Sequence, residues 1–546
     1  MAIDVTSLYN RRADNRWDRT SVGDVLERVA AVRPDATAFV AGPGAHGDPA
    51  FARITYGAAD EWANRFANAL LSGGLQRADR VLMICGNSVD AFVAKIGVAK
   101  AGGVVVPINP SQVADFVEHA VRLTEPMLII ADTEYANLAA AVGRKVDVHV
   151  PIGDGPADGP SMREFCEVAS PAPPEVTIHG DDIWEILFTS GTTAMPKGVL
   201  LSHAYAYLTA LGATATHSRG VRHESLLRSV CFAPVMFHIG DQGYVMPTLF
   251  CGGTVLLGRA HNPKQAAALI AAEKATLAIT GNRYLTGQLL AELEALEPGA
   301  ASSLTCVLHA TGILTPDELA RFEALAPGVS VTYQAGQTEC VASHRFPYDA
   351  FPERYADALD RHLNLIGQPP PLLASACVDV EDGVTPVPHD TIGELVYRSP
   401  VMTAGYYRDH EATERAFAHG WFHTGDLGTT EPPGERTITG RLKDVIKTGG
   451  ENVASIRVES VVLLHPGIDQ VAVIGLPDER WGEIVTAVVI PKPDATVDER
   501  ELIGFCRERL PGFETPKRVI VVDKFPLGLG GKVLKHELRA QFLAVP

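Results

Sequence analysis

Short apolar runs alternate with longer helical patterns through the first part of this chain. Arg80–Ile84 and Val104–Pro107 are compact apolar runs of the length that buried strands have, and Asp90–Ala101 between them has the spacing of a helix. Strands that alternate with helices in this way form βαβ units around parallel sheets. We therefore expect an α/β fold with a large N-terminal lobe of βαβ-type layered sheets.

The pattern changes towards the C-terminus. From Ala374 onward the predicted strands are shorter and the turns are more frequent. The stretch beyond Arg441 has the size of one ordinary domain of about 100 residues, with its own strands and a helix at Glu501–Arg509. We expect residues 1–440 to form the N-terminal lobe and residues 441–546 a small α+β domain, with the boundary near Gly440–Lys443.

Charge and composition narrow the classes of partner. The 546 residues have a formal net charge of -18 and contain no dense run of Lys and Arg, so we expect no nucleic-acid partner. No uninterrupted apolar run reaches the ~18 residues of a membrane span. A polar N-terminus and eight cysteines without a CxxC pair favour a cytoplasmic protein with reduced thiols. A polyphosphate site in such an acidic chain must supply its own positive charge.

The most informative local motif follows the predicted strand Ile183–Phe188. The run Phe188-Thr-Ser-Gly-Thr-Thr-Ala-Met-Pro-Lys-Gly198 combines hydroxylated residues, glycine and lysine. Backbone N–H groups and hydroxyls of such a loop can approach an anion, and the lysine adds charge. The run differs from GxxxxGK[ST], because no Ser or Thr follows the lysine. We interpret it as a phosphate loop with these ligands: Thr189, Ser190, Gly191, Thr192, Thr193 and Lys197.

This loop resembles that of the adenylate-forming superfamily, in particular its acyl-CoA synthetase branch of AMP-dependent ligases. The family's loop has the pattern Thr-Ser-Gly-Thr-Thr/Ser-Gly-x-Pro-Lys-Gly, from which residues 189–198 depart only in Ala194. The resemblance extends over residues 20–540 and includes four further segments: Tyr333–Glu339, Gly420–Leu427, Gly440–Val453 and Pro526–Lys532.

The resemblance implies a site for ATP and Mg²⁺. Thr338 would contact phosphate and Glu339 would hold Mg²⁺, for which an oxygen ligand is suited. Asp426 would accept the ribose hydroxyls, and Arg441 would contact ATP or the ribose. The other residues implied beside the nucleotide are Gly312, Gln334, Ala335 and Gly336. Ala335 is a departure, because the family usually has at this position an aromatic residue that lies against adenine.

The C-terminal motifs resemble the mobile part of the family. Lys532 corresponds to the adenylation lysine, whose charge stabilises the transition state as pyrophosphate departs. Lys443 lies at the hinge position, about which the small domain would rotate. After that rotation Lys447, Gly449 and Gly450 would face the site for the second half-reaction.

His238 lies in an aromatic-His segment that resembles the family's gate between acid and nucleotide. A neutral imidazole there can also orient a carboxylate. We expect the acid pocket to be lined from residues 232–245, 281–287 and 308–314. The sequence does not identify the acid.

These features imply ATP-dependent activation of a small-molecule carboxylic acid as its acyl-adenylate, with release of pyrophosphate and then transfer to CoA. One alternative is an adenylating enzyme whose acceptor is not CoA but a carrier-protein thiol or an amine. This alternative includes the activation of nitrite for diazotisation of an arylamine in specialised metabolism. Another is a non-catalytic nucleotide- or acyl-binding relative. The joint presence of five residues argues against the last: Lys197, Glu339, Asp426, Arg441 and Lys532.

We predict that Lys532→Ala abolishes adenylate formation but spares thioester formation from a supplied acyl-adenylate. The lysine would act only while charge builds up on the departing pyrophosphate. Pyrophosphate exchange and single-turnover thioester formation measure the two halves separately. An equal loss in both halves would contradict the two-position interpretation.

Overall fold

The computed structural model describes residues 20–157, 159–189, 196–311, 313–361, 363–449, 451–493, 495–527 and 533–543. Packing divides the described chain into two compact units. The first contains the described residues up to 343 together with residues 400–410. The second contains the described residues of 344–399 and those from 411 onward.

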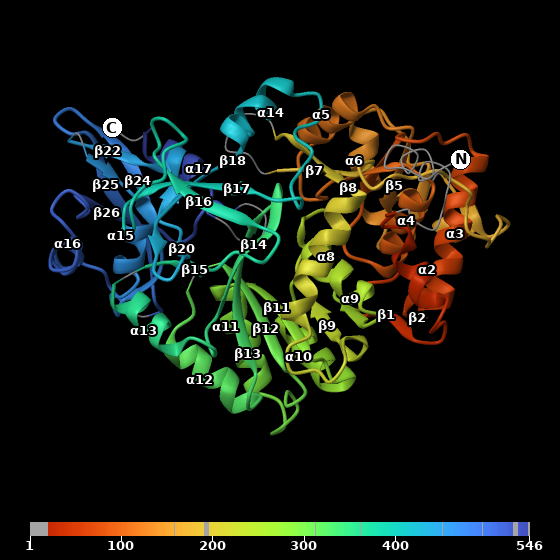
Figure 1. Cartoon of the computed structure of the whole chain (residues 1–546), viewed down its shortest axis with the longest axis horizontal. Coiled ribbons are helices and arrows are strands. Elements are labelled where there is room, and N and C mark those ends of the chain that lie inside the picture. Colours follow the sequence, from red (N-terminus) through yellow and green to blue (C-terminus); the bar gives the residue numbers. More distant parts are fainter. Residues whose placement is uncertain are drawn as a thin grey trace, which may run out of the picture. The chain divides into compact units, whose positions relative to one another are not determined.

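Two sheets form the centre of the first unit (Figure 1). The six-stranded sheet has the order β6-β5-β3-β4-β7-β8, and its neighbours are parallel except for β7 and β8. Its strands are β3 (Arg80–Ile84), β4 (Val104–Pro107), β5 (Leu128–Asp132), β6 (Val148–Val150), β7 (Ile183–Phe188) and β8 (Gly198–Ser202).

The eight-stranded sheet has the order β14-β13-β12-β11-β9-β10-β1-β2 and is parallel from β13 to β1. Strand β2 pairs with β1 in the antiparallel direction, and β14 belongs to this unit as far as Ser343. The strands are β1 (Thr37–Ala41), β2 (Arg53–Thr55), β9 (Arg228–Cys231), β10 (Thr254–Leu257), β11 (Leu277–Asn282), β12 (Cys306–Thr311), β13 (Ser330–Gln337) and β14 (Cys340–Pro347).

Helices pack against both sheets of the first unit. Helix α4 contacts β4 of one sheet and β1 of the other, and all of its residues are buried. The side chains of Thr55, Ser88 and Ser202 cap α3, α4 and α8 by accepting a backbone N–H bond. The helices are α2 (Asp24–Ala30), α3 (Tyr56–Ser72), α4 (Val89–Lys100), α5 (Ala114–Thr124), α6 (Ala136–Ala141), α7 (Met162–Cys166), α8 (His203–His217), α9 (Met246–Phe250), α10 (Pro263–Glu273), α11 (Arg283–Glu294) and α12 (Pro316–Leu325).

The second unit contains three small sheets. Their orders are β15-β20-β19, β16-β17-β18-β21 and β23-β22-β25-β24, with β26 paired to β25. The strands are β15 (Leu365–Gly367), β16 (Ala374–Val378), β17 (Gly393–Arg398), β18 (Phe422–Gly428), β19 (Thr430–Glu431), β20 (Glu435–Thr437), β21 (Gly440–Arg441), β22 (Ile446–Thr448), β23 (Glu451–Val453), β24 (Ile468–Asp478), β25 (Gly482–Pro491) and β26 (Arg518–Val521). The helices are α13 (Pro352–Asp360), α14 (His410–Ala416), α15 (Ser455–Val462), α16 (Glu499–Arg507) and α17 (Lys535–Leu543).

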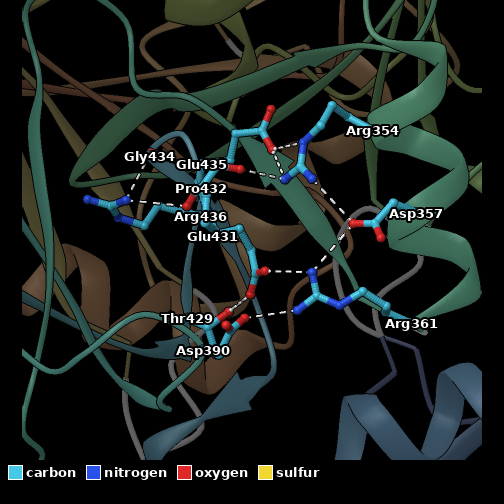
Figure 2. Close-up of polar contacts among 10 residues, drawn as sticks. All are labelled: Arg354, Asp357, Arg361, Asp390, Thr429, Glu431, Pro432, Gly434, Glu435 and Arg436. Atoms are coloured by element: carbon cyan, nitrogen blue, oxygen red, sulfur yellow. Dashed lines mark hydrogen bonds and ion pairs between the residues drawn. The ribbon is translucent and has the colours of Figure 1, made fainter.

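A network of ion pairs fastens α13 to the hairpin of β19 and β20 (Figure 2). Arg361 lies 2.9 Å from both Asp390 Oδ1 and Glu431 Oε2, and Arg354 lies 2.8 Å from Glu435 Oε2. Glu431 and Glu435 are buried, so each carboxylate depends on its arginine for compensation of its charge. The hairpin follows β18 directly, and the network therefore helps to fix the end of that strand.

The two sheets, in which most neighbouring strands are parallel, confirm the expected α/β class. Strands β3, β4 and β7 begin and end at the predicted residues, and the helix predicted at Glu501–Arg509 is α16, Glu499–Arg507. The boundary near residue 440 stays a prediction. The two compact units meet at other points of the chain, near residues 343, 400 and 410. None of the helices in the described ranges is long and apolar enough to cross a membrane.

Four fully buried polar side chains meet in the core of the first unit: Lys95, Glu185, Asp241 and Gln242. The Lys95 ammonium contacts the Glu185 carboxylate and lies 2.5 Å from Asp241 Oδ2. Gln242 Nε2 donates to Glu185 Oε2 at 2.7 Å. Burial, and then the charge of Asp241, raise the pKa of Glu185 to about 8. One carboxyl of the pair therefore keeps a proton at neutral pH, which leaves the cluster close to neutral.

We predict that Glu185→Gln reduces the loss of stability with rising pH. The pKa of Glu185 is raised from 4.5 to about 8, so within that window the folded state keeps a proton that the unfolded chain releases. This contribution is full at low pH and is lost as the pH rises through the folded-state pKa. Urea unfolding at a series of pH values measures this effect. Between about pH 5 and about pH 8, the free energy of unfolding of the variant should rise by more than about 1 kcal/mol relative to that of the wild type. Parallel curves for the two proteins would contradict the assignment.

Candidate functional site

The ends of the predicted phosphate loop lie side by side in the first unit. Phe188 of β7 pairs with Gly198 of β8, and the Thr189 N–H donates to the Lys197 carbonyl at 3.1 Å. A Cβ atom at Gly198 would lie 2.7 Å from Ile186 Cγ2, so only glycine fits there. The loop therefore leaves and rejoins the sheet at one fixed point, with Thr189 and Lys197 at its ends.

Tyr406 connects the loop lysine with the predicted metal ligand. Its hydroxyl donates to Glu339 Oε1 at 2.9 Å, and the Lys197 ammonium lies 4.9 Å from the centre of its ring. Lys197 Nζ also lies 3.8 Å from Asp409 Oδ2. Burial and the nearby charge of Glu339 raise the pKa of Tyr406, so the phenol stays protonated and continues to donate. Tyr406 lies outside the motifs identified in the sequence, although the run Gly405-Tyr-Tyr is visible there as an aromatic pair after glycine.

Thr338 and Glu339 form the turn between β13 and β14. Tyr205 of α8 holds this turn, because its hydroxyl donates to the Thr338 carbonyl at 3.2 Å and accepts the Val341 N–H at 3.0 Å. The Thr403 N–H donates to the Glu339 carbonyl at 2.9 Å. Both predicted phosphate and metal contacts are thus at the tip of a hairpin that is fixed from two sides.

His238 precedes the π-helix Asp241–Val245. Its Nδ1 accepts the Gly240 N–H at 3.1 Å, so the neutral ring carries its proton on Nε2. The His238 side chain keeps some exposed surface, although many protein atoms surround it. The resulting loss of hydration lowers its pKa, which keeps the imidazole neutral at physiological pH.

The residues of β13 that precede the turn face different surroundings. Gln334 and Ala335 are buried, whereas Gly336 is exposed. Gln334 Oε1 has no hydrogen-bond partner among the described residues. Ala335 is buried and has no ring, and its place beside adenine stays a prediction.

In the second unit, the predicted ribose ligand lies beside the predicted ATP contact. Asp426 of β18 pairs in register with Arg441 of β21, and Asp426 Oδ1 lies 3.0 Å from Arg441 Nε. Burial and the charge of Arg441 lower the pKa of the neighbouring Lys443. The strand pairing thus brings together two residues that the sequence separates.

Lys447 and Gly449 lie in and just beyond β22. The Lys447 side chain is exposed, and the backbone N–H of Lys447 donates to Glu483 Oε2 at 2.9 Å. Gly449 has a φ of 60°, and a Cβ atom there would lie 2.6 Å from Trp481 Cε3. The Gly449 N–H donates to the Trp481 carbonyl at 2.8 Å, so this half-exposed tryptophan, also missed from the sequence, supports the glycine.

Seven predicted residues lie outside the described ranges: Ser190, Gly191, Thr192, Thr193, Gly312, Gly450 and Lys532. The described part of the chain contains no group of three or more His, Cys, Asp or Glu side chains that could hold a metal. A single carboxylate such as Glu339 suits Mg²⁺, which takes most of its ligands from water and substrate phosphates.

The loop lysine, the hairpin carboxylate and the Asp–Arg pair all lie in motifs that resemble those of the adenylate-forming enzymes. The family model for the AMP-binding enzymes matches residues 26–407, and that for the AMP-binding enzyme C-terminal domain matches residues 457–532. The chain belongs to the family of AMP-binding enzymes.

Its relatives match along nearly their whole length. Feruloyl-CoA synthase of an Amycolatopsis species is 30% identical over 94% of this chain and 98% of its own. The long-chain-fatty-acid–CoA ligase FadD13 of Mycobacterium tuberculosis is 31% identical over 96% of this chain and 99% of its own. The crystal structure of ATP-bound MatB from Rhodopseudomonas palustris superposes with a TM-score of 0.82 and 29% identity, covering 96% of this chain and 99% of MatB.

We predict that Tyr406→Phe raises the Mg²⁺ concentration needed for half-maximal pyrophosphate exchange. A hydrogen bond to a charged group contributes about 1.5–3 kcal/mol, so the shift should be about tenfold or more. Tyr407→Phe is the matched control, because the Tyr407 side chain packs beside Arg408 rather than on Glu339. If both variants show the wild-type Mg²⁺ dependence, the Tyr406 hydroxyl does not position a metal ligand.

Proposed function

We propose that this chain is an AMP-forming acid–CoA ligase. The contact of Tyr406 with both Lys197 and Glu339 is the observation that supports this most directly. Lys197 can supply a cation for the triphosphate, and Glu339, on the other side of Tyr406, is a carboxylate suited to Mg²⁺. When bound, the metal would offset charge on the phosphate oxygens.

In the first half-reaction, a carboxylate oxygen of the acid attacks the α-phosphorus of ATP. The bond between that phosphorus and the oxygen bridging to the β-phosphate breaks, and pyrophosphate leaves. Lys197 offsets negative charge on the phosphates while the loop amides hold them in position. Lys532 stabilises the departing pyrophosphate, and Asp426 with Arg441 holds the ribose end of the nucleotide.

In the second half-reaction, the CoA thiolate attacks the acyl carbon of the adenylate. A carbon–sulfur bond forms, the bond from the acyl carbon to the AMP oxygen breaks, and AMP leaves. We propose that residues 441–546 rotate about Lys443 between the two steps. The face with Lys447, Gly449 and Gly450 then replaces Lys532.

The names of the relatives indicate which classes of acid to test as substrates. One is named for the aryl acid ferulate and another for long-chain fatty acids. Both classes therefore belong in a substrate panel, with nitrite as the non-carboxylate member.

The test is ATP–pyrophosphate exchange across aryl acids, fatty acids and nitrite, with CoA added in parallel reactions. We expect exchange that requires a carboxylic acid, and with CoA the formation of AMP and an acyl thioester. Lys447→Ala should keep exchange and lose thioester formation. ATP consumption that ignores CoA and requires nitrite plus an arylamine would overturn the proposal in favour of diazotisation.

A further inference from the structure

Lys95 joins two elements of the first unit that are far apart in the sequence. Its ammonium, at the middle of α4, contacts Glu185 of β7 and lies 2.5 Å from Asp241 Oδ2 of the π-helix. The face of the Trp184 ring lies 5.2 Å from the same nitrogen. Gln242 Nε2 closes the cluster on Glu185 Oε2 at 2.7 Å. Three elements are thus tied to one another through a single side chain.

The two partners of Lys95 lie next to the residues predicted to act on substrate. Glu185 lies in β7, which ends at Phe188, where the phosphate loop begins. The Asp241 N–H donates to the His238 carbonyl at 3.2 Å, within the turn that presents the imidazole. A shift of either carboxylate therefore moves the phosphate loop or His238.

Stability alone gives little reason for this arrangement. A buried ion pair costs desolvation, and well-packed apolar residues often stabilise a core as much. The directional contacts of the Lys95 ammonium with Glu185 and Asp241 fix the positions of β7 and the π-helix relative to α4, which apolar packing does less specifically. A π-helix is also a distortion found frequently at functional sites, and this one begins at Asp241.

We propose that Lys95 is a positioning residue for adenylate formation, holding the strand that leads into the phosphate loop at a fixed distance from the turn that presents His238. This inference rests on the proposed function.

The same helix provides a matched control. Lys100 of α4 is also fully buried and also contacts two carboxylates, Asp60 Oδ1 at 2.8 Å and Glu27 Oε2 at 3.1 Å. Those partners lie in α3 and α2, which carry none of the predicted site residues. Lys95→Met and Lys100→Met therefore remove equivalent charges from one helix, but only the first touches elements of the site.

The experiment compares thermal unfolding and pyrophosphate-exchange kinetics of the two variants, with exchange measured where each is fully folded. Both should unfold at a lower temperature than the wild type. Lys95→Met should lower kcat by about 10²-fold, the effect of misplacing reacting groups by about 1 Å, and leave the KM for ATP nearly unchanged. Lys100→Met should keep the wild-type kcat.

Equal kcat values for the two variants would overturn the inference, and so would a loss confined to KM. If Lys95→Met does not fold, Lys95→Met with Asp241→Asn replaces it, because the pair removes both charges together. The double variant should show the same loss of kcat, and wild-type kcat in it would refute the positioning role. Absence of exchange in the wild type with every acid would instead count against the proposed function.

Discussion

Strand β8 is hydrogen-bonded along both of its edges, and the site of the first unit depends on this pairing. One edge pairs with β7, and the other exchanges backbone bonds with residues 404–407: Leu200 N–H to the Gly405 carbonyl at 2.9 Å and Ala404 N–H to the Leu200 carbonyl at 3.0 Å. The first edge closes the phosphate loop, and the second carries Tyr406 to Glu339. Backbone hydrogen bonds hold both the ends of the phosphate loop and the segment that carries Tyr406. The position of Lys197 relative to Glu339 therefore does not depend on flexible side chains alone.

Much of this fold could be predicted from the sequence where burial dictates the pattern. The runs that became β3, β4 and β7 are mainly apolar on both faces, as central parallel strands are, and their limits agree with the prediction. Helix α7 falls within a Pro- and Gly-rich stretch, Pro151–Thr177, whose composition is typical of a loop; its capping box, Ser161 with Glu164, was the available local signal.

The site was predicted as a set of separate motifs, because motif spacing does not indicate which side chains meet. The pairing of Asp426 with Arg441 follows from strand register, and the contact of Tyr406 with Glu339 follows from the return of residues 400–410 to the first unit. The Lys95 cluster could not be read from the sequence either, since a lysine within an apolar helix ordinarily extends towards solvent. Long-range contacts of single residues carry no periodic signal.

Trp481 has a consequence for observing this protein in solution. Its ring is 40% exposed and lies against Gly449, close to Lys447, whereas Trp184 is fully buried in the other unit. Indole emission shifts with the polarity around the ring, so a change of surroundings at the Lys447–Gly449 face alters the fluorescence of Trp481. Trp481 is one of five tryptophans in the chain, and its share of the emission reports on the face proposed to act in the second half-reaction.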